Sequence, residues 1–146
     1  MNHLDDCVFC GLYRGSLEAS TVLRNARVMA AMTIRPMHVG HVLLFPEAHV
    51  EDFARLSQSE LGYLFHVAGR LKAAICEAIP CQGFQLLINE GEATGQKKNC
   101  RHVHIHLIPC SSSAPAIVGG RPADAPRTEL DQAARRIAGR LNEGIA

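Results

Sequence analysis

Three histidines alternate with apolar residues in the segment Arg101–Pro109, which reads RHVHIHLIP. Successive side chains of a β-strand point to opposite faces, so His102, His104 and His106 would share one face while the apolar residues pack on a core. A neutral imidazole is a nucleophile, a proton carrier and a metal ligand near neutral pH. Histidine has no special preference for strands. The pattern therefore favours a row of imidazoles lining a pocket over a polar strand face that contains histidine by chance.

The N-terminal segment carries two cysteines, Cys7 and Cys10, in a C-x-x-C arrangement. This spacing is typical of a zinc knuckle or a redox pair. A redox pair normally lies between a strand and a helix, and no strand is predicted ahead of Cys7, so zinc is favoured. The other cysteines have no ligand-like spacing, and we expect them to include buried small apolar residues. They are Cys76, Cys81, Cys100 and Cys110.

The triad segment is one of several strands predicted from alternating apolar residues and turn signals. Residues 20–24 and 27–32 are typical of a hairpin. Residues 41–45 are typical of a buried strand, and residues 83–89 of a further strand. The polar segment 90–98 is expected to be a loop that leads into the triad strand.

Two helices are predicted from capping signals and helical periodicity. Ser57 and Glu60 form a capping box at the start of the first helix, and Pro80 ends it. Its expected apolar face consists of Leu61, Leu64, Phe65, Ala68, Leu71, Ile75 and Ile79. Thr128 is expected to cap the last helix, after a flexible connection over residues 111–126. Its apolar face would consist of Leu130, Ala134, Ile137 and Leu141.

The order of these elements predicts the α+β class, with an antiparallel sheet of about five strands, a long central helix and a C-terminal helix. The chain has 146 residues, which suits a single domain over residues 1–146. Its core is expected in about residues 7–110, followed by a C-terminal loop and helix over residues 111–146.

Composition narrows the range of partners. A formal net charge of +1 gives no broad attraction to nucleic acid or to membranes. The apolar runs are too short to span a bilayer, and the polar, acidic N-terminus is unlike a signal peptide. We therefore expect a cytoplasmic protein with reduced thiols, and neither nucleic acid nor a membrane as its partner.

Other motifs stand in a fixed order around the triad. Asn89-Glu90-Gly91 and then Gly95-Gln96 precede it, and the segment 36–49 reads Pro-x-x-x-Gly-His, a strand, then Pro-x-x-His. This ordered set, spread over residues 7–109, resembles the histidine triad (HIT) superfamily of nucleotide hydrolases and transferases. The resemblance implies the HIT fold.

The resemblance also implies a covalent reaction. The middle histidine, His104, would attack the α-phosphate and form a nucleotidyl-histidine, which water or another acceptor then resolves. His106 would contact phosphate oxygens and help the leaving group depart. Asn89 would donate an amide hydrogen bond to the phosphate, and Gly91 would let the backbone approach closely. The substrate would be a nucleoside phosphate derivative, such as a dinucleoside polyphosphate or a nucleoside phosphoramidate.

In zinc-containing relatives the first triad histidine is a metal ligand. Here Cys7, Cys10, His49 and His102 would complete a Cys2His2 set for one structural zinc ion. Zinc would then fix His102 and so brace the strand that carries the nucleophile. The alternative is a metal-free pair of reduced cysteines.

Two departures from the family pattern concern substrate binding. Five residues rather than three separate Gln96 from His102, so either Gln96 keeps its role or Lys98 takes the glutamine position. Thr33 stands where many relatives carry an acidic residue that binds ribose hydroxyls, and threonine is a weaker partner for a cis-diol. His41 takes the position of the family's structural histidine and is expected to make a buried hydrogen bond, whereas His38 is expected to be exposed.

Three functional hypotheses remain. The first is an enzyme acting through His104. The second is a non-catalytic nucleotide-binding or interaction protein on the same scaffold. The third is a metal hydrolase that uses all three triad histidines as ligands, which leaves Cys7, Cys10 and His49 without a role.

A homodimer is expected, because many HIT proteins pair their sheets across a two-fold axis. The helix that begins at Ser57 gives an additional reason. Tyr63, Val67 and Ala74 extend apolar surface beyond its main stripe, and a symmetric partner would cover them.

Overall fold

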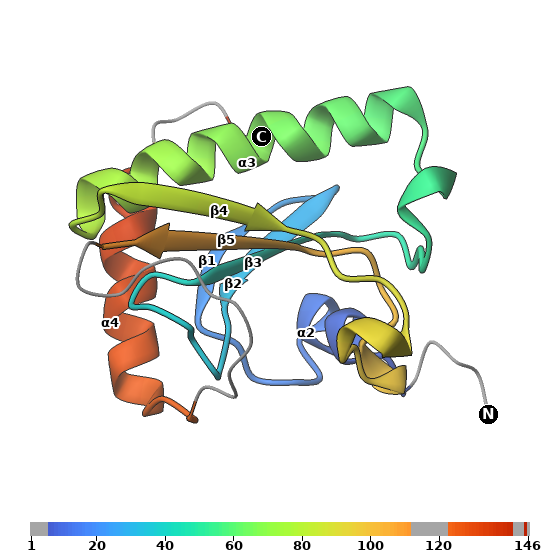
Figure 1. The fold of residues 1–146 in the computed structure, drawn as a ribbon, viewed down its shortest axis with the longest axis horizontal. Helices are drawn as coiled ribbons and strands as arrows, with labels where there is room; N and C mark the ends of the chain where they lie inside the picture. Colours follow the sequence, from blue (N-terminus) through green and yellow to red (C-terminus); the bar gives the residue numbers. More distant parts are fainter. Residues whose placement is uncertain (1–5, 112–122, 142–144, 146) are drawn as a thin grey trace.

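The fold is described from a computed structural model for residues 6–111, 123–141 and 145 (Figure 1). Its centre is an antiparallel sheet with the strand order β1-β2-β3-β5-β4. The strands are β1 (Thr21–Arg24), β2 (Val28–Met32), β3 (Val42–Pro46), β4 (Gly83–Leu87) and β5 (Ile105–Cys110). The helices are α2 (Val8–Arg14), α3 (Gln58–Ala78) and α4 (Arg127–Ala138), with short 3-10 turns η1 (Phe53–Arg55), η2 (Glu92–Thr94) and η3 (Lys98–Cys100). This arrangement confirms the predicted α+β class, the five-stranded sheet and both predicted helices.

The two faces of the sheet are covered by different elements. Helices α3 and α4 pack on one face, and α2 lies with η3 on the other (Figure 1). Strand β2 is buried at all five positions as a result. Its residues Val28, Ala30 and Met32 face the α3–α4 side, whereas Met29 and Ala31 face α2.

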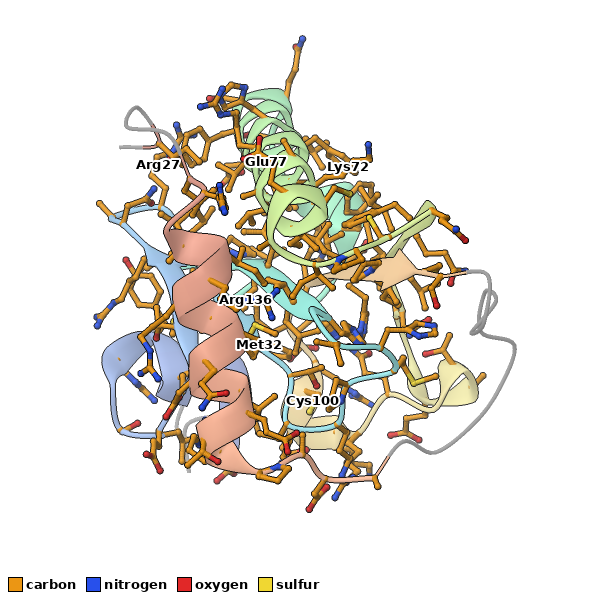
Figure 2. All side chains as sticks on the ribbon, turned by 90° about the vertical axis from the view of Figure 1, so that its left-hand side faces the viewer. Arg27, Met32, Lys72, Glu77, Cys100 and Arg136 are labelled. Carbon is orange, nitrogen blue, oxygen red and sulfur yellow. The ribbon has the colours of Figure 1, made fainter. Side chains whose placement is uncertain are left out.

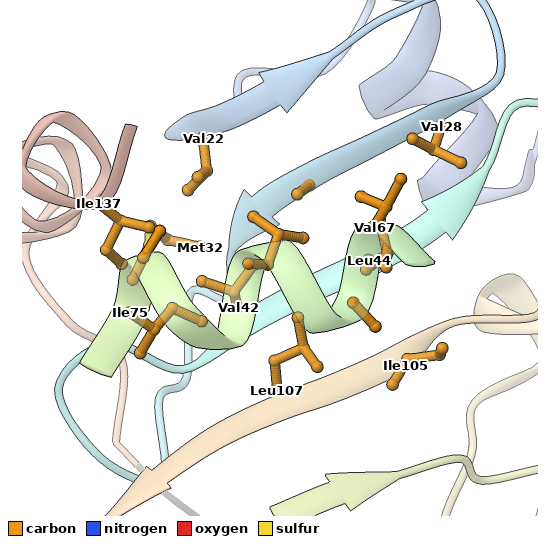
Figure 3. Packing of buried hydrophobic residues seen from close by; sticks show 14 of the residues in the cluster. Val22, Val28, Met32, Val42, Leu44, Val67, Ile75, Ile105, Leu107 and Ile137 are labelled. Atoms are coloured by element: carbon orange, nitrogen blue, oxygen red, sulfur yellow. The ribbon is translucent and has the colours of Figure 1, made fainter. Parts of the chain in front are cut away.

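The larger core lies between the sheet and the two long helices (Figure 3). The predicted apolar face of α3 is wrong at Phe65, which is 44% exposed. It is also too narrow, since Val67 and Ala74 are only 0% and 2% exposed. Both residues belong to the same core, in which α3 contacts β3, β5 and α4. Val67 and Ala74 therefore leave no apolar surface for a partner, and this part of the dimer argument is wrong.

The ends of α3 are fixed by hydrogen bonds. The predicted capping box is confirmed: the Glu60 amide donates to Ser57 Oγ over 3.2 Å, and the Ser57 amide donates to the Glu60 carboxylate over 2.7 Å. At the other end, the Arg136 guanidinium of α4 donates to the carbonyl of Ala78 (Figure 2). Pro80 follows shortly and prevents another turn.

Helix α4 begins two residues earlier than its sequence suggests. Its N-cap is Pro126 rather than Thr128, and no side chain caps it. The start of the helix is held instead by Ser20, the residue before β1. Its Oγ donates to the Asp131 carboxylate and accepts from the Arg127 guanidinium. Most of the predicted connection over residues 111–126 lies outside the described residues.

The triad strand is shorter than predicted, since β5 begins at Ile105 and so leaves His102 and His104 ahead of it. The chain there is still held, because the Val103 amide donates to the carbonyl of Val50, just beyond β3. Histidines and apolar residues still alternate between the two faces. Val103 and Ile105 lie in the larger core, whereas His102 and His104 point away from it. Among the described helices, none has both the length and the apolar character to cross a membrane.

Candidate active site and metal centre

The triad histidines pack against an aromatic ring from the N-terminal helix. Phe9 of α2 stacks on His104 with ring centroids 4.4 Å apart and contacts His102 at 5.5 Å. Both histidines are buried on the face of the sheet that carries α2. Sequence reasoning missed Phe9, although its place between the two cysteines of the C-x-x-C pair was a usable signal.

The tautomer of His104 follows from one hydrogen bond. Its Nδ1 lies 2.7 Å from the backbone carbonyl of His102, so Nδ1 carries the proton and donates it. Burial lowers the pKa of His104 below its ordinary value. The ring is therefore neutral at pH 7, with the lone pair of Nε2 available for reaction.

His106 belongs to a second, directed chain of hydrogen bonds. The Met37 amide donates to His41 Nδ1 over 3.1 Å, which leaves the proton of His41 on Nε2. That Nε2 lies 3.0 Å from His106 Nδ1 and donates to it. The proton of neutral His106 is consequently on its own Nε2, which makes this atom a donor. The hydrogen bond expected of His41 is present, whereas His38 is half-buried rather than exposed and its Nε2 lacks a partner among the described residues.

Both histidines of this hydrogen-bond chain are held neutral. Burial is the main cause that lowers the pKa of His41 to about 3 and that of His106 to about 4, and neighbouring imidazoles add to it. Protonation of either ring would also break the donor order between His41 and His106.

A pocket of about 670 Å³ opens beside these histidines. Its size is typical of a small-molecule site. The lining includes five of the residues predicted from the sequence, namely Thr33, Asn89, Gln96, His104 and His106. Gly91 does not line it. The walls are otherwise largely apolar, with Phe9 and Leu12 from α2 and Ile34 from the turn after β2.

Gln96 holds the loop that borders the pocket. Its Oε1 accepts from the Gly91 amide over 2.9 Å, and its Nε2 donates to the carbonyl of Cys100 over 2.8 Å. Gly91 has φ +86°, a conformation that favours glycine, and this places its amide toward Gln96. Lys98 lines a separate pocket next to Cys7. Of the two alternatives from the sequence, Gln96 is thus the residue that faces the histidine pocket.

Charged residues from distant segments complete the pocket, and sequence reasoning missed them. Glu18, from the segment before β1, is the one acidic residue among the described lining residues. Arg35 and Arg127 come from the turn after β2 and the first turn of α4, and Lys97 from the loop before the triad. No local signal pointed to Arg127, because it reaches the pocket only through the docking of α4 on the sheet.

Next to the pocket, four ligand atoms converge from three segments of the chain. Those of Cys7, Cys10, His49 and His102 all lie within 4.8 Å of one another. The Sγ of Cys7 is 3.6 Å from His102 Nδ1, and the Sγ of Cys10 is 3.3 Å from His49 Nδ1. The structure therefore brings together the whole set that the sequence suggested.

The other ring nitrogens in this cluster are already engaged. His102 Nε2 donates to the carbonyl of Pro46 over 2.9 Å, and His49 Nε2 lies 3.3 Å from the Glu51 carboxylate. Each ring thus presents the lone pair of Nδ1 to the two sulfurs, as metal-bound histidines with an outer partner do. Two thiols and two imidazoles in this arrangement fit a tetrahedral metal site.

Folding stability is expected to decrease as the pH falls from about 6.5 toward 4. In the unfolded chain His41 and His106 regain their ordinary pKa of 6.5, so the unfolded state binds protons that the folded state excludes. Their contribution is complete above the unfolded pKa and is lost toward the lower folded values. Thermal midpoints measured across this range should fall less steeply in His41→Gln than in the wild type. The exposed His66→Gln variant is the matched control, and equal slopes in all three proteins would contradict the assignment.

Comparison with known proteins identifies similar sequences. The sequence model of one family, described as the HIT domain, matches residues 14–112. An uncharacterized HIT-like protein of Saccharolobus solfataricus is 31% identical over 112 residues, which cover 77% of this chain and 79% of that protein. The adenosine 5'-monophosphoramidase of Candida albicans is 26% identical over 130 residues, covering 86% of this chain and 83% of that protein.

Solved structures show the same architecture. A protein from Sulfolobus tokodaii, described as a hypothetical histidine triad nucleotide-binding protein, superposes with a TM-score of 0.82 at 24% identity, over 92% of this chain and 91% of that one. A Zn-bound histidine triad family protein from Mycobacterium smegmatis gives a TM-score of 0.79 at 23% identity, over 94% of each chain. At these identities the likeness is one of fold.

Proposed function

Because the chain belongs to the HIT domain family, we propose that it is a nucleotide hydrolase or transferase that forms a covalent nucleotidyl intermediate on His104. The observation that supports this proposal most strongly is the tautomer, protonation state and location of the His104 ring. Its Nδ1 is committed to the carbonyl of His102, its pKa is lowered by burial, and it lines the pocket. At the level of the family, nucleotide chemistry is supported by the relative named as an adenosine 5'-monophosphoramidase.

In the first step, the lone pair of His104 Nε2 attacks the α-phosphorus and forms an N–P bond. The bond from phosphorus to the leaving group breaks, and its electron pair departs with that group. Positive charge develops on the His104 ring, and the carbonyl of His102 stabilises it through the Nδ1 hydrogen bond. In the second step, water or another acceptor attacks phosphorus and the electron pair of the N–P bond returns to Nε2.

Neighbouring side chains would stabilise the phosphate. His106 offers Nε2–H to a phosphate or leaving-group oxygen, because the hydrogen bond from His41 fixes its tautomer. Asn89 and the cationic Lys97 both line the pocket, and Asn89 supplies amide donors. Gln96 and Gly91 act indirectly by holding the loop. Thr33 also lines the pocket and is proposed to contact the nucleoside.

Zinc is proposed as a structural cofactor held by Cys7, Cys10, His49 and His102. When bound, the ion would fix the His102 ring without taking part in the reaction. The carbonyl of this same residue holds His104 Nδ1, so the position of the metal ligand bears directly on the nucleophile.

The hypothesis of three catalytic metal ligands is disfavoured by the directions of the rings. His102 Nδ1 faces the two cysteines, whereas His104 Nδ1 faces a carbonyl and His106 Nδ1 faces His41. Within the described residues, the ligand cluster contains only the first of the three. A non-catalytic nucleotide-binding protein is the remaining alternative.

Turnover assays on chemically distinct substrates test the proposal against that alternative. The panel comprises adenosine 5'-phosphoramidate, a diadenosine polyphosphate and an adenylylated amine, each with a guanosine counterpart. We expect at least one class to release a nucleoside monophosphate catalytically. Binding of these compounds without any product, at enzyme concentrations comparable with substrate, would favour the non-catalytic alternative.

The chain is also proposed to form a homodimer through β4. This strand is at the edge of the sheet, and its residues Leu86 and Leu87 are 47% and 42% exposed. An exposed apolar edge strand is a template for pairing with a second copy. Light scattering at micromolar concentration should give a dimer for the wild type and a monomer after Leu86→Lys with Leu87→Lys. Val39→Lys, at an exposed apolar residue outside β4, is the matched control; a monomeric wild type would refute the interface.

A further inference from the structure

Two cysteines outside the pocket and the metal cluster are in contact. Cys76 lies on the last turn of α3, and Cys81 follows Pro80 in the connection to β4. The Cys81 thiol donates to Cys76, with the two sulfur atoms 2.9 Å apart. Cys76 is exposed and Cys81 half-buried, whereas Cys110 is the buried cysteine that was expected among the four without ligand-like spacing.

We propose that Cys76 and Cys81 form an oxidative modification site, at which a peroxide converts the two thiols into an intrachain disulfide. One thiolate attacks the peroxide oxygen and becomes a sulfenic acid as the O–O bond breaks. The second sulfur then attacks the sulfenic sulfur, and the S–S bond forms as water leaves. Overall, two thiols and one hydrogen peroxide give one disulfide and two waters. A thiol reductant reverses the reaction.

The other cysteines are placed differently. Cys7 and Cys10 are also close together, but both belong to the ligand cluster for which zinc is proposed. The Cys110 thiol is buried and donates to the Gln85 side chain and the Ile108 carbonyl, and the Cys100 thiol donates to Asn99. 

Proximity, rather than acidity, distinguishes the pair. Although the Cys76 residue is exposed, partial desolvation of its sulfur, together with the neighbouring Cys81 sulfur, raises the pKa of its thiol to about 11. The thiol is thus mainly protonated at neutral pH, and a lone cysteine of this kind would react slowly. A sulfur already in contact with its partner, however, needs little chain movement to complete the second step.

The disulfide would cross-link the turn between α3 and β4, which packs against the segment that precedes His41. Ile79 lies between the two cysteines in the chain and packs against Gly40. The contact is close, since a Cβ atom added to Gly40 would lie 3.0 Å from Ile79 Cγ1. Gly40 has φ +91° and directly precedes His41, which orients His106. A closed ring across this turn lowers the entropy of the unfolded chain, so oxidation is expected to raise the thermal midpoint by a few degrees.

The test uses the full chain purified without chelator. The protein is treated with hydrogen peroxide, its free thiols are blocked with N-ethylmaleimide, and it is digested with trypsin without reductant. Cleavage after Lys72 and Lys97 places both cysteines in one peptide, residues 73–97, which contains no other cysteine. We expect this peptide to be unlabelled and lighter by two hydrogen atoms, and to take up two labels after reduction.

Two variants distinguish the effects of the Cys76–Cys81 disulfide from those of oxidation elsewhere in the protein. Cys81→Ser should lose both the two-hydrogen mass change and the rise in thermal midpoint, whereas Cys110→Ala should keep both. Two labels on the 73–97 peptide of oxidised protein, or a disulfide between that peptide and another, would overturn the proposal. An unchanged thermal midpoint in the disulfide-bonded wild type would contradict the proposed stabilisation of the turn by the disulfide.

Discussion

His104→Ala is expected to lower kcat by at least about a thousandfold on any substrate that the wild type turns over. The change removes the atom that would bond to phosphorus, and no neighbour replaces it. His102 Nδ1 faces the metal cluster, and His106 Nδ1 already accepts from His41. Steady-state product formation is the measurement, at substrate concentrations well above KM so that binding does not limit it.

The matched control for this change is His66→Ala, which removes an exposed imidazole from α3. It should keep wild-type kcat. Circular dichroism and thermal melting establish that His104→Ala is folded, since the change leaves space beneath Phe9. A folded His104→Ala protein with wild-type kcat would refute covalent catalysis at this residue.

Loss of the metal site is expected to lower both the zinc content and the thermal stability of the protein strongly. We expect one zinc ion per chain in protein purified without chelator, and close to none after Cys7→Ser with Cys10→Ser. Because metal binding is coupled to folding, the thermal midpoint should drop by roughly 10 °C. The buried site joins α2 to the chain after β3 and to the triad, so its loss would loosen all three segments.

The matched control removes two cysteines elsewhere, as Cys76→Ser with Cys81→Ser. This protein should retain one zinc ion per chain and, under reducing conditions, most of its thermal stability. Metal analysis by mass spectrometry gives the stoichiometry. Wild-type protein without zinc, or a Cys7 and Cys10 double variant that still binds it, would exclude the assigned ligands.

Local sequence signals predicted most of the fold that positions the site. The hairpin of β1 and β2 and the capping box at Ser57 depend on residues close together in the chain, and both are present. The convergence of Cys7, Cys10, His49 and His102 was also anticipated, from the C-x-x-C spacing and from the resemblance to zinc-containing relatives.

Contacts between distant segments could not be predicted in the same way. Phe9 covers His104 only because α2 folds back onto the sheet, and Arg127 reaches the pocket only because α4 docks beside β1. The burial of Val67 and Ala74 likewise depends on elements that are distant in the sequence, and Val67 lies beside Leu44 of β3 (Figure 3). Periodicity gives the direction of a helical stripe but does not show how many neighbours will pack on it.

The central claim, a nucleotidyl bond to His104, is tested most directly by trapping it. Wild-type protein is mixed briefly with a substrate that it turns over and quenched under alkaline denaturing conditions, which preserve phosphoramidates. Its intact mass is then measured and its peptides are sequenced by mass spectrometry. The account predicts one added nucleoside monophosphoryl group, located on His104 and absent from His104→Ala. Rapid turnover without any adduct at the earliest times, or an adduct located on another residue, would contradict it.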